Sequence, residues 1–141
     1  MRALMEGEAA ARASRYGEDF TSIFLALEKT EQAAQSGDVA AYVSANDEFH
    51  HAIWKTGKGQ RLETLLHQIW NGLPTRLPEL LTEQIERSLS EHKQLVKVIS
   101  ERKADEARAT MSHHIMRSFH DFVASREHTQ QAPTQAEGKG E

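Results

Sequence analysis

The side chains best suited to chemistry in this sequence are its histidines, of which there are eight among 141 residues, while cysteine is absent. Histidine is the commonest metal ligand in proteins and the side chain that titrates near neutral pH. The lack of cysteine excludes a disulfide framework, a thiolate metal site and a cysteine nucleophile. Chemistry in this chain must therefore use imidazole, amide and carboxylate groups.

Three histidines fall inside apolar stripes with helical spacing, each in a different segment. His50 belongs to the stripe at positions 39, 42, 43, 46, 49, 50 and 53, where Asn46 lies four residues earlier and projects from the same face. His92 is in the middle of the stripe 85, 88, 89, 92, 95, 96 and 99, and His114 is in the middle of the stripe 107, 111, 114, 115, 118 and 122. We therefore expect three helices each to point one imidazole inward.

Three inward imidazoles favour a shared metal ion on energetic grounds. A buried imidazole without a partner costs about 1–3 kcal/mol, and three of them would consume much of a typical stability of about 5–15 kcal/mol. One divalent cation would satisfy all three. Three neutral imidazoles with open coordination positions are the ligand set of a metal that keeps water or substrate in its shell. Asn46 could add a weak, neutral carbonyl oxygen as a fourth ligand.

Two other interpretations of these histidines remain open. Asp47 and His51 are also four residues apart and form a rival ligand pair, although this frame turns Val43 and Phe49 less inward. A lone histidine on an apolar face is also more often a hydrogen-bonded core residue than a ligand. The remaining histidines lie off the stripes or near the C-terminus, and we expect them to be solvated: His51, His67, His113, His120 and His128.

Two further polar residues are candidates for contacting a small-molecule effector. Arg76 shares a face with Leu73 and Leu77, and an inward arginine near a cationic metal could grip a ligand carboxylate bidentately. Its alternative role is a surface ion pair with Glu79. Ser88 lies one turn before His92 and could either orient that imidazole or bind the ligand.

The fold predicted from the periodicity is all-α. Helical segments span about 2–14, 20–36, 39–56, 62–73, 82–101 and 104–125, with Gly37 as a helix stop and Asp38 as the next N-cap. Pro74 and Pro78 interrupt the fourth segment. Short connections favour an antiparallel bundle. We expect one domain over residues 1–126, followed by a polar, disordered tail over 127–141.

Composition and motifs exclude several functional classes. The formal net charge is −4 and the basic residues are spread among acidic ones, which argues against direct binding of nucleic acid. No apolar run approaches the roughly 18 residues of a membrane span, and the absence of a signal peptide pattern points to the cytoplasm. The sequence has no phosphate-binding glycine loop, no G-x-S-x-G and no H-E-x-x-H, so we do not expect an enzyme.

Several of these segments resemble the FCD domain, the C-terminal effector domain of FadR-subfamily GntR transcription regulators. Residues 46–53 are similar to its [D/N]-x-x-F-H-x-A-I helix, and residues 2–6 to its R-x-x-x-E pattern. Glu91-His92, followed after 22 residues by His114 in the M-x-x-H-I pattern of residues 111–115, is similar to its E-H and M-x-x-H segments. The resemblance covers roughly residues 2–125.

The resemblance implies a bundle of six or seven antiparallel helices around a central metal and ligand cavity. It implies Asn46, His50, His92 and His114 as metal ligands, zinc or nickel as the metal, a small organic acid as effector, and a homodimer. The sequence departs from the family at Asn46, where aspartate is commoner, and at Lys58-Gly59, where Gly-Asn is usual. The winged helix-turn-helix expected before such a domain is absent, so we expect no specific DNA binding by this chain alone.

The leading functional hypothesis is therefore a ligand-sensing regulatory domain that holds a divalent metal, and two alternatives stand beside it. One is a small helical metalloenzyme with a three-histidine site, which would need an acid–base residue facing the metal. The other is a helical interaction module whose core histidines bind no metal. Metal analysis separates the last of these from the other two.

Overall fold

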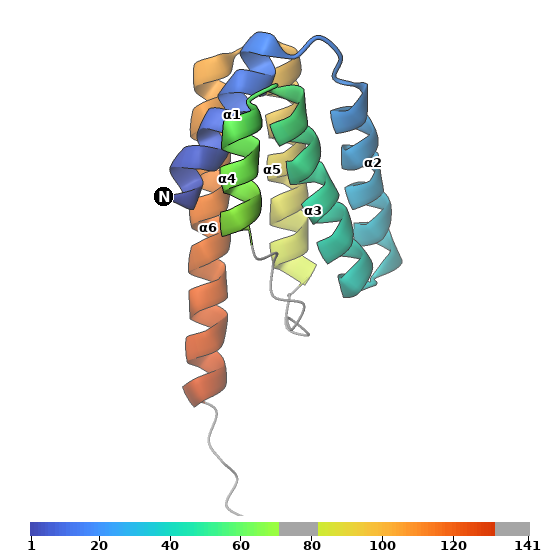
Figure 1. The fold of residues 1–141 in the computed structure, drawn as a ribbon. Coiled ribbons are helices and arrows are strands. Elements are labelled where there is room, and N and C mark those ends of the chain that lie inside the picture. Colours follow the sequence, from blue (N-terminus) through green and yellow to red (C-terminus); the bar gives the residue numbers. More distant parts are fainter. Residues whose placement is uncertain (71–81, 132–141) are drawn as a thin grey trace, which may run out of the picture.

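The computed structural model describes residues 1–70 and 82–131 and consists, over those ranges, of helices and short connections. The helices are α1 (Arg2–Tyr16), α2 (Thr21–Ser36), α3 (Val39–Thr56), α4 (Gln60–Ile69), α5 (Thr82–Ser100) and α6 (Ala104–Gln131). Successive helices run in opposite directions (Figure 1). The prediction of an all-α antiparallel bundle is confirmed.

The ends of α2 and α3 follow the predicted turn chemistry. Gly37 adopts a left-handed conformation with φ of 74°, which is accessible to glycine without steric cost, and its N–H bonds to the carbonyl of Ala34. The Asp38 carboxylate then accepts the N–H of Ala41 at 3.2 Å and caps α3. This tight connection sets α2 and α3 side by side as an antiparallel pair.

Helix α6 differs from the prediction at its C-terminal end. It continues to Gln131, beyond the expected end near residue 125, and its final turns project past the rest of the bundle (Figure 1). Residues 127–131, expected in the tail, are therefore helical, and residues 132–141 lie outside the described part of the chain, as does the segment with Pro74 and Pro78. Phe119, on the outer surface of this helix, is 57% exposed.

The main core lies between α1, α2, α3, α5 and α6. Helix α1 packs along α6, where Gly7 lies so close to Ser112 that a Cβ atom would come within 2.5 Å of its hydroxyl. The buried core side chains are mostly aliphatic, with one phenylalanine: Ala10, Ala13, Ile23, Ala26, Phe49, Ile53, Leu95, Val96, Val98, Ile99, Ala107, Met111 and Ile115. Phe24 of α2, by contrast, is half-exposed.

Helix α3 has no close backbone contact with α5 or α6 among the described residues, although each of these helices carries one of the predicted ligands. Side chains therefore fill the space between the three helices. None of the helices in residues 1–70 and 82–131 is long and apolar enough to cross a lipid bilayer.

Candidate metal centre

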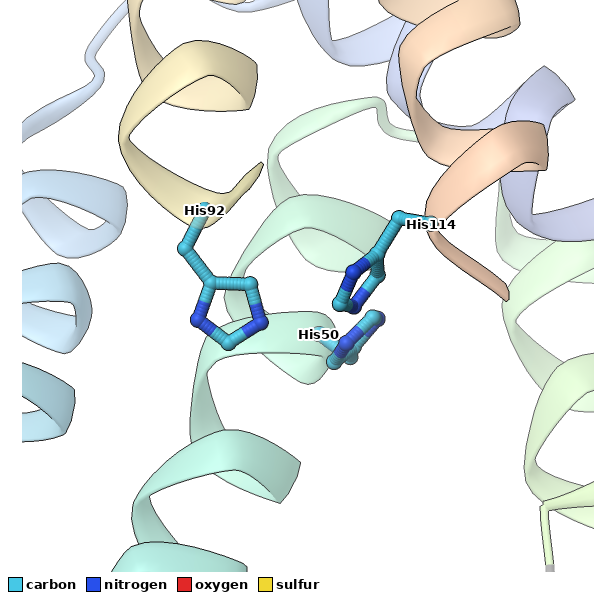
Figure 2. A group of neighbouring side chains, drawn as sticks. All are labelled: His50, His92 and His114. Carbon is cyan, nitrogen blue, oxygen red and sulfur yellow. The ribbon is translucent and has the colours of Figure 1, made fainter. Parts of the chain in front are cut away.

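The three predicted ligands meet in the interior of the bundle. His50 from α3, His92 from α5 and His114 from α6 are 1%, 0% and 3% exposed, and one nitrogen from each lies within 4.8 Å of the others. Figure 2 shows the three imidazoles converging from their separate helices. In the part of the chain that is described, no other group of three or more histidine, aspartate or glutamate side chains satisfies this criterion.

The separation of these nitrogens fits a single divalent cation after a small adjustment. Three atoms no more than 4.8 Å apart all lie within about 2.8 Å of a common point, whereas zinc–imidazole bonds are about 2.0–2.1 Å long. Ring movements of less than about 1 Å would therefore close the site. The ring planes of His50 and His114 are nearly parallel, with centroids 5.5 Å apart, and His92 meets both nearly edge-on.

A carboxylate from α1 orients His50. Glu6 is completely buried, and its Oε2 lies 3.4 Å from Nδ1 of His50 and accepts the indole N–H of Trp54 at 2.8 Å. Burial alone would raise the pKa of Glu6, but its interactions with His50, Trp54 and Arg2 outweigh burial and lower that pKa. A charged Glu6 accepts the proton on Nδ1 of His50, so Nε2 is the nitrogen free to bind a metal.

A second carboxylate, on α5, orients His114 in the same way. Oε2 of Glu91 is hydrogen-bonded to Nδ1 of His114, and both carboxylate oxygens of Glu91 also accept from Arg117. Burial would raise the pKa of Glu91, but the hydrogen bonds from His114 and Arg117 lower it to about 2. His114 therefore donates from Nδ1 to a fixed anion, and its Nε2 is left for a metal.

His92 has no such partner among residues 1–70 and 82–131. Within these ranges both of its buried ring nitrogens lack a hydrogen-bond partner, and the ring stacks on Phe49 with centroids 4.2 Å apart. Burial, followed by the neighbouring His114 and His50, lowers the pKa of His92 well below its usual value. A neutral imidazole with a free lone pair, buried beside two others, is a donor that a metal ion would satisfy. The residues present thus fit a divalent cation.

Asn46 lies one turn before His50 on α3 and is 5% exposed. Its role as a fourth ligand stays a prediction. The rival pair of Asp47 and His51 does not join the three histidines in a common ligand group. His51 is half-buried, with its ring against Trp54 and His67, so the prediction that it would be solvated is wrong. His67, His113 and His120 are exposed, as expected.

The two candidate effector contacts have different outcomes. Arg76 lies within residues 71–81, outside the described part of the chain. The Ser88 hydroxyl accepts a hydrogen bond from Nη2 of Arg117 at 3.0 Å. It does not orient His92 through a hydrogen bond, since neither nitrogen of that ring has a partner among the residues that the structure describes. Ser88 belongs instead to the polar network around Glu91.

The supporting residues were not assigned a role from the sequence. Glu6 precedes Ala9, Ala10 and Ala13 at helical spacing. A carboxylate on a face of such small residues is expected to be buried, and a buried carboxylate needs a partner. Arg117 lies three residues after His114, on the neighbouring part of the same helix face, and gave no comparable signal. Trp70, which also received no role from the sequence, has its ring 5.0 Å from the His50 ring and 3.9 Å from the Arg2 guanidinium carbon.

The sequence model of the FCD domain matches residues 1–117, a span that contains all three histidines and both carboxylates. No characterised protein and no solved structure gave a significant match to the chain. FCD domains are the regulatory, effector-binding domains of GntR-family regulators, which agrees with a bundle that encloses a polar centre. On this match and this fold, the chain belongs to the FCD domain family.

Proposed function

We propose that this FCD domain senses a small organic acid through a divalent metal, zinc or nickel, held by His50, His92 and His114, with the Asn46 carbonyl as a weak fourth ligand. The observation that carries the proposal is the convergence of three buried imidazoles on one point. A divalent cation there would supply positive charge and open coordination positions for an anionic group.

The charge of the ligand set favours an anionic effector. Three imidazoles and an asparagine amide are all neutral, so the ligands leave the full charge of the cation uncompensated. Glu6 and Glu91 contact the imidazoles on the side away from the metal-binding nitrogens, and each is also near an arginine. A carboxylate is the common anion that both coordinates zinc and neutralises it.

Binding would be transmitted because the ligands come from three helices. Closing the nitrogens onto a metal and an effector draws α3, α5 and α6 together, and this selects one arrangement of the bundle over others. In a complete regulator such a shift would change the placement of attached DNA-binding domains and of a partner protomer. Arg76 remains a candidate for a second effector contact.

The same geometry weighs against a metalloenzyme. The two carboxylates at the site, Glu6 and Glu91, are both engaged by imidazole N–H groups. A general base must reach the proton that it removes, and neither carboxylate is oriented to do so. Regulation by effector binding therefore accounts for the described site better than catalysis does.

The direct test is elemental analysis of protein purified without a histidine tag. We expect about one equivalent of zinc or nickel in the wild type and a large loss in His114→Ala. The neighbouring His113→Ala is a matched control, because His113 is exposed on the same helix and should keep the metal. Metal contents that are equal in these two variants would contradict the proposal.

The effector part is tested separately by thermal-shift screening of the metal-loaded protein. Monocarboxylates, dicarboxylates and sugar acids form the panel, and the same panel is repeated after removal of the metal with EDTA. We expect at least one acid to raise the melting temperature only when the metal is present. No response to any acid, or an equal response in EDTA, would count against an effector bound at the metal.

A further inference from the structure

The three imidazoles differ in how well hydrogen bonds fix their orientation, and His114 is fixed best. Its Nδ1 is hydrogen-bonded to Glu91, whereas the corresponding contact of His50 with Glu6 is long, at 3.4 Å. His92 has no hydrogen-bond partner in the described part of the chain. The feature that distinguishes the Glu91 side of the site is Arg117. In the described structure Arg117 forms no hydrogen bond to His114. Its hydrogen bonds go to other side chains instead.

Arg117 is bound on all sides by groups that fix its position. Its Nε and Nη2 donate to the two oxygens of Glu91, its Nη1 donates to Asp121, and Nη2 also reaches the hydroxyl of Ser88 at 3.0 Å. The side chain is only 13% exposed. A two-pronged arginine–carboxylate contact fixes the plane of the carboxylate as well as its charge.

The geometry leaves little freedom to Glu91. One oxygen, Oε1, is occupied by Nε of Arg117, and the other, Oε2, accepts from both Nη2 of Arg117 and Nδ1 of His114. Without Arg117, Glu91 could rotate away from His114 toward water, since it is not fully buried. His114 would then lose the acceptor that fixes both its ring orientation and its tautomer.

The contrast with Glu6 strengthens this reading. Arg2 also lies near its carboxylate, but Nε of Arg2 is 3.9 Å from Oε1 of Glu6. Neither of these two atoms has a hydrogen-bond partner within residues 1–70 and 82–131. Arg2 instead lies over the ring of Trp70. The Arg2–Glu6 pair therefore supplies charge without the bidentate hydrogen bonding that Arg117 makes to Glu91.

We propose that Arg117 is a positioning residue for the metal centre, which acts by clamping Glu91 as the acceptor for Nδ1 of His114 so that Nε2 faces the metal. This proposal rests on the metal site proposed above. It states that Arg117 sets the metal affinity of the part of the site formed by α5 and α6. Ser88 and Asp121 take part by holding the guanidinium in place.

The test measures Co²⁺ affinity of the tag-free, metal-stripped full chain by its visible d–d absorption, with the melting temperature in EDTA recorded for every variant. We expect Arg117→Met to weaken Co²⁺ binding by about 10–100-fold, the usual effect of losing a partner that orients a metal ligand. Arg117→Lys, which keeps the charge without the two-point grip, should weaken it less. The matched control is Arg108→Met. Arg108 also lies on α6 and forms ion pairs, with Glu8 and Asp105, but it lies away from the histidines.

A double-mutant cycle separates positioning from general support of the fold. If Arg117 acts through Glu91, then Arg117→Met should have little further effect on Co²⁺ affinity when Glu91→Gln is already present. An equal loss in both backgrounds would overturn the proposal. So would a Co²⁺ affinity of Arg117→Met within twofold of the wild type, whatever its melting temperature in EDTA.

The remaining outcomes are also decisive. If Arg117→Met does not fold, Arg117→Lys replaces it in the cycle, and an unchanged Co²⁺ affinity in that variant overturns the proposal. If the wild type itself does not bind Co²⁺, the proposed metal site and the role of Arg117 both fail. Binding by the wild type with no effect at position 117 rejects only the role of Arg117.

Discussion

Individual side chains determine the protonation state of the site. Glu6 is a fully buried carboxylate and Glu91 a partly buried one, and both remain ionised because each accepts a hydrogen bond from an imidazole and lies near an arginine. They in turn hold the Nδ1 protons of His50 and His114. Because metal ligation requires neutral imidazoles with a free lone pair, this hydrogen-bond pattern prepares two of the three rings for a cation.

The buried histidines should make the metal-free domain sensitive to mild acid. Burial lowers the pKa of His92 and of His114, the latter despite the opposing effect of Glu91. In the unfolded chain histidine titrates near about 6.5. Below that pH the unfolded chain takes up protons that the folded core rejects, so stability is complete above about pH 6.5 and falls as the pH is lowered. The lowered pKa values of Glu6 and Glu91 add a further loss that begins only near about pH 4.5.

The measurement is urea denaturation in EDTA at several pH values from 7.5 to 5. We expect the free energy of unfolding to fall across this range, by about 1.4 kcal/mol for each tenfold difference in proton affinity between the folded and unfolded states. His92→Gln, which removes one titrating group, should make the dependence shallower. A free energy that is constant over this range would contradict the placement of neutral imidazoles in the core.

At the scale of helices, the site depends on the angular position of each ligand on its helix and on the loops that align α3, α5 and α6. The α2–α3 connection is the clearest example, since a left-handed glycine and an aspartate N-cap together reverse the chain within two residues. The α5–α6 connection is held differently. Arg102 adopts a φ of 60°, and its side chain donates to the carbonyls of Ser14 and Gly17 at the end of α1.

Gly37→Ala should destabilise the domain by about 1 kcal/mol, because a Cβ atom disfavours the left-handed conformation at this position. There is open space around Gly37, so the cost is conformational and not a clash. Gly37→Asn should cost less, since asparagine tolerates this region better than alanine. Thermal or urea unfolding measures both, and equal effects of the two substitutions would show that the backbone conformation is not the cause.

Helical spacing predicted which three histidines face the interior, but it did not predict all of their surroundings. The faces of His50, His92 and His114 follow from a period of 3.6 residues, which depends only on local sequence. Burial depends on what covers a face, and the period alone therefore does not show that Phe24 and Phe119 are about half exposed. The partnership of Glu6 with His50 and Trp54 joins residues more than 40 positions apart, which no local pattern encodes.

For the whole molecule, metal binding and stability should be linked. The three histidines belong to different helices, so a metal bound to them only in the folded domain would stabilise the entire bundle. A ligand at 100 times its dissociation constant contributes about 2.7 kcal/mol, and for a domain of this size that corresponds to several degrees in melting temperature.

Differential scanning calorimetry with added zinc and with EDTA measures this link. We expect the difference in melting temperature between the two conditions to disappear in His50→Ala and to persist in His51→Ala, its immediate neighbour outside the ligand group. A difference of the same size in both variants would place the stabilising metal elsewhere in the chain.

The central claim is that three imidazoles share one metal ion, and X-ray absorption at the zinc edge of the zinc-loaded, tag-free protein tests it most directly. We predict three imidazole nitrogens at about 2.0–2.1 Å, with the remaining scattering from oxygen. The multiple-scattering signal of the rings should fall to that of two imidazoles in His92→Gln. A spectrum with one imidazole or none in the wild type would contradict the account.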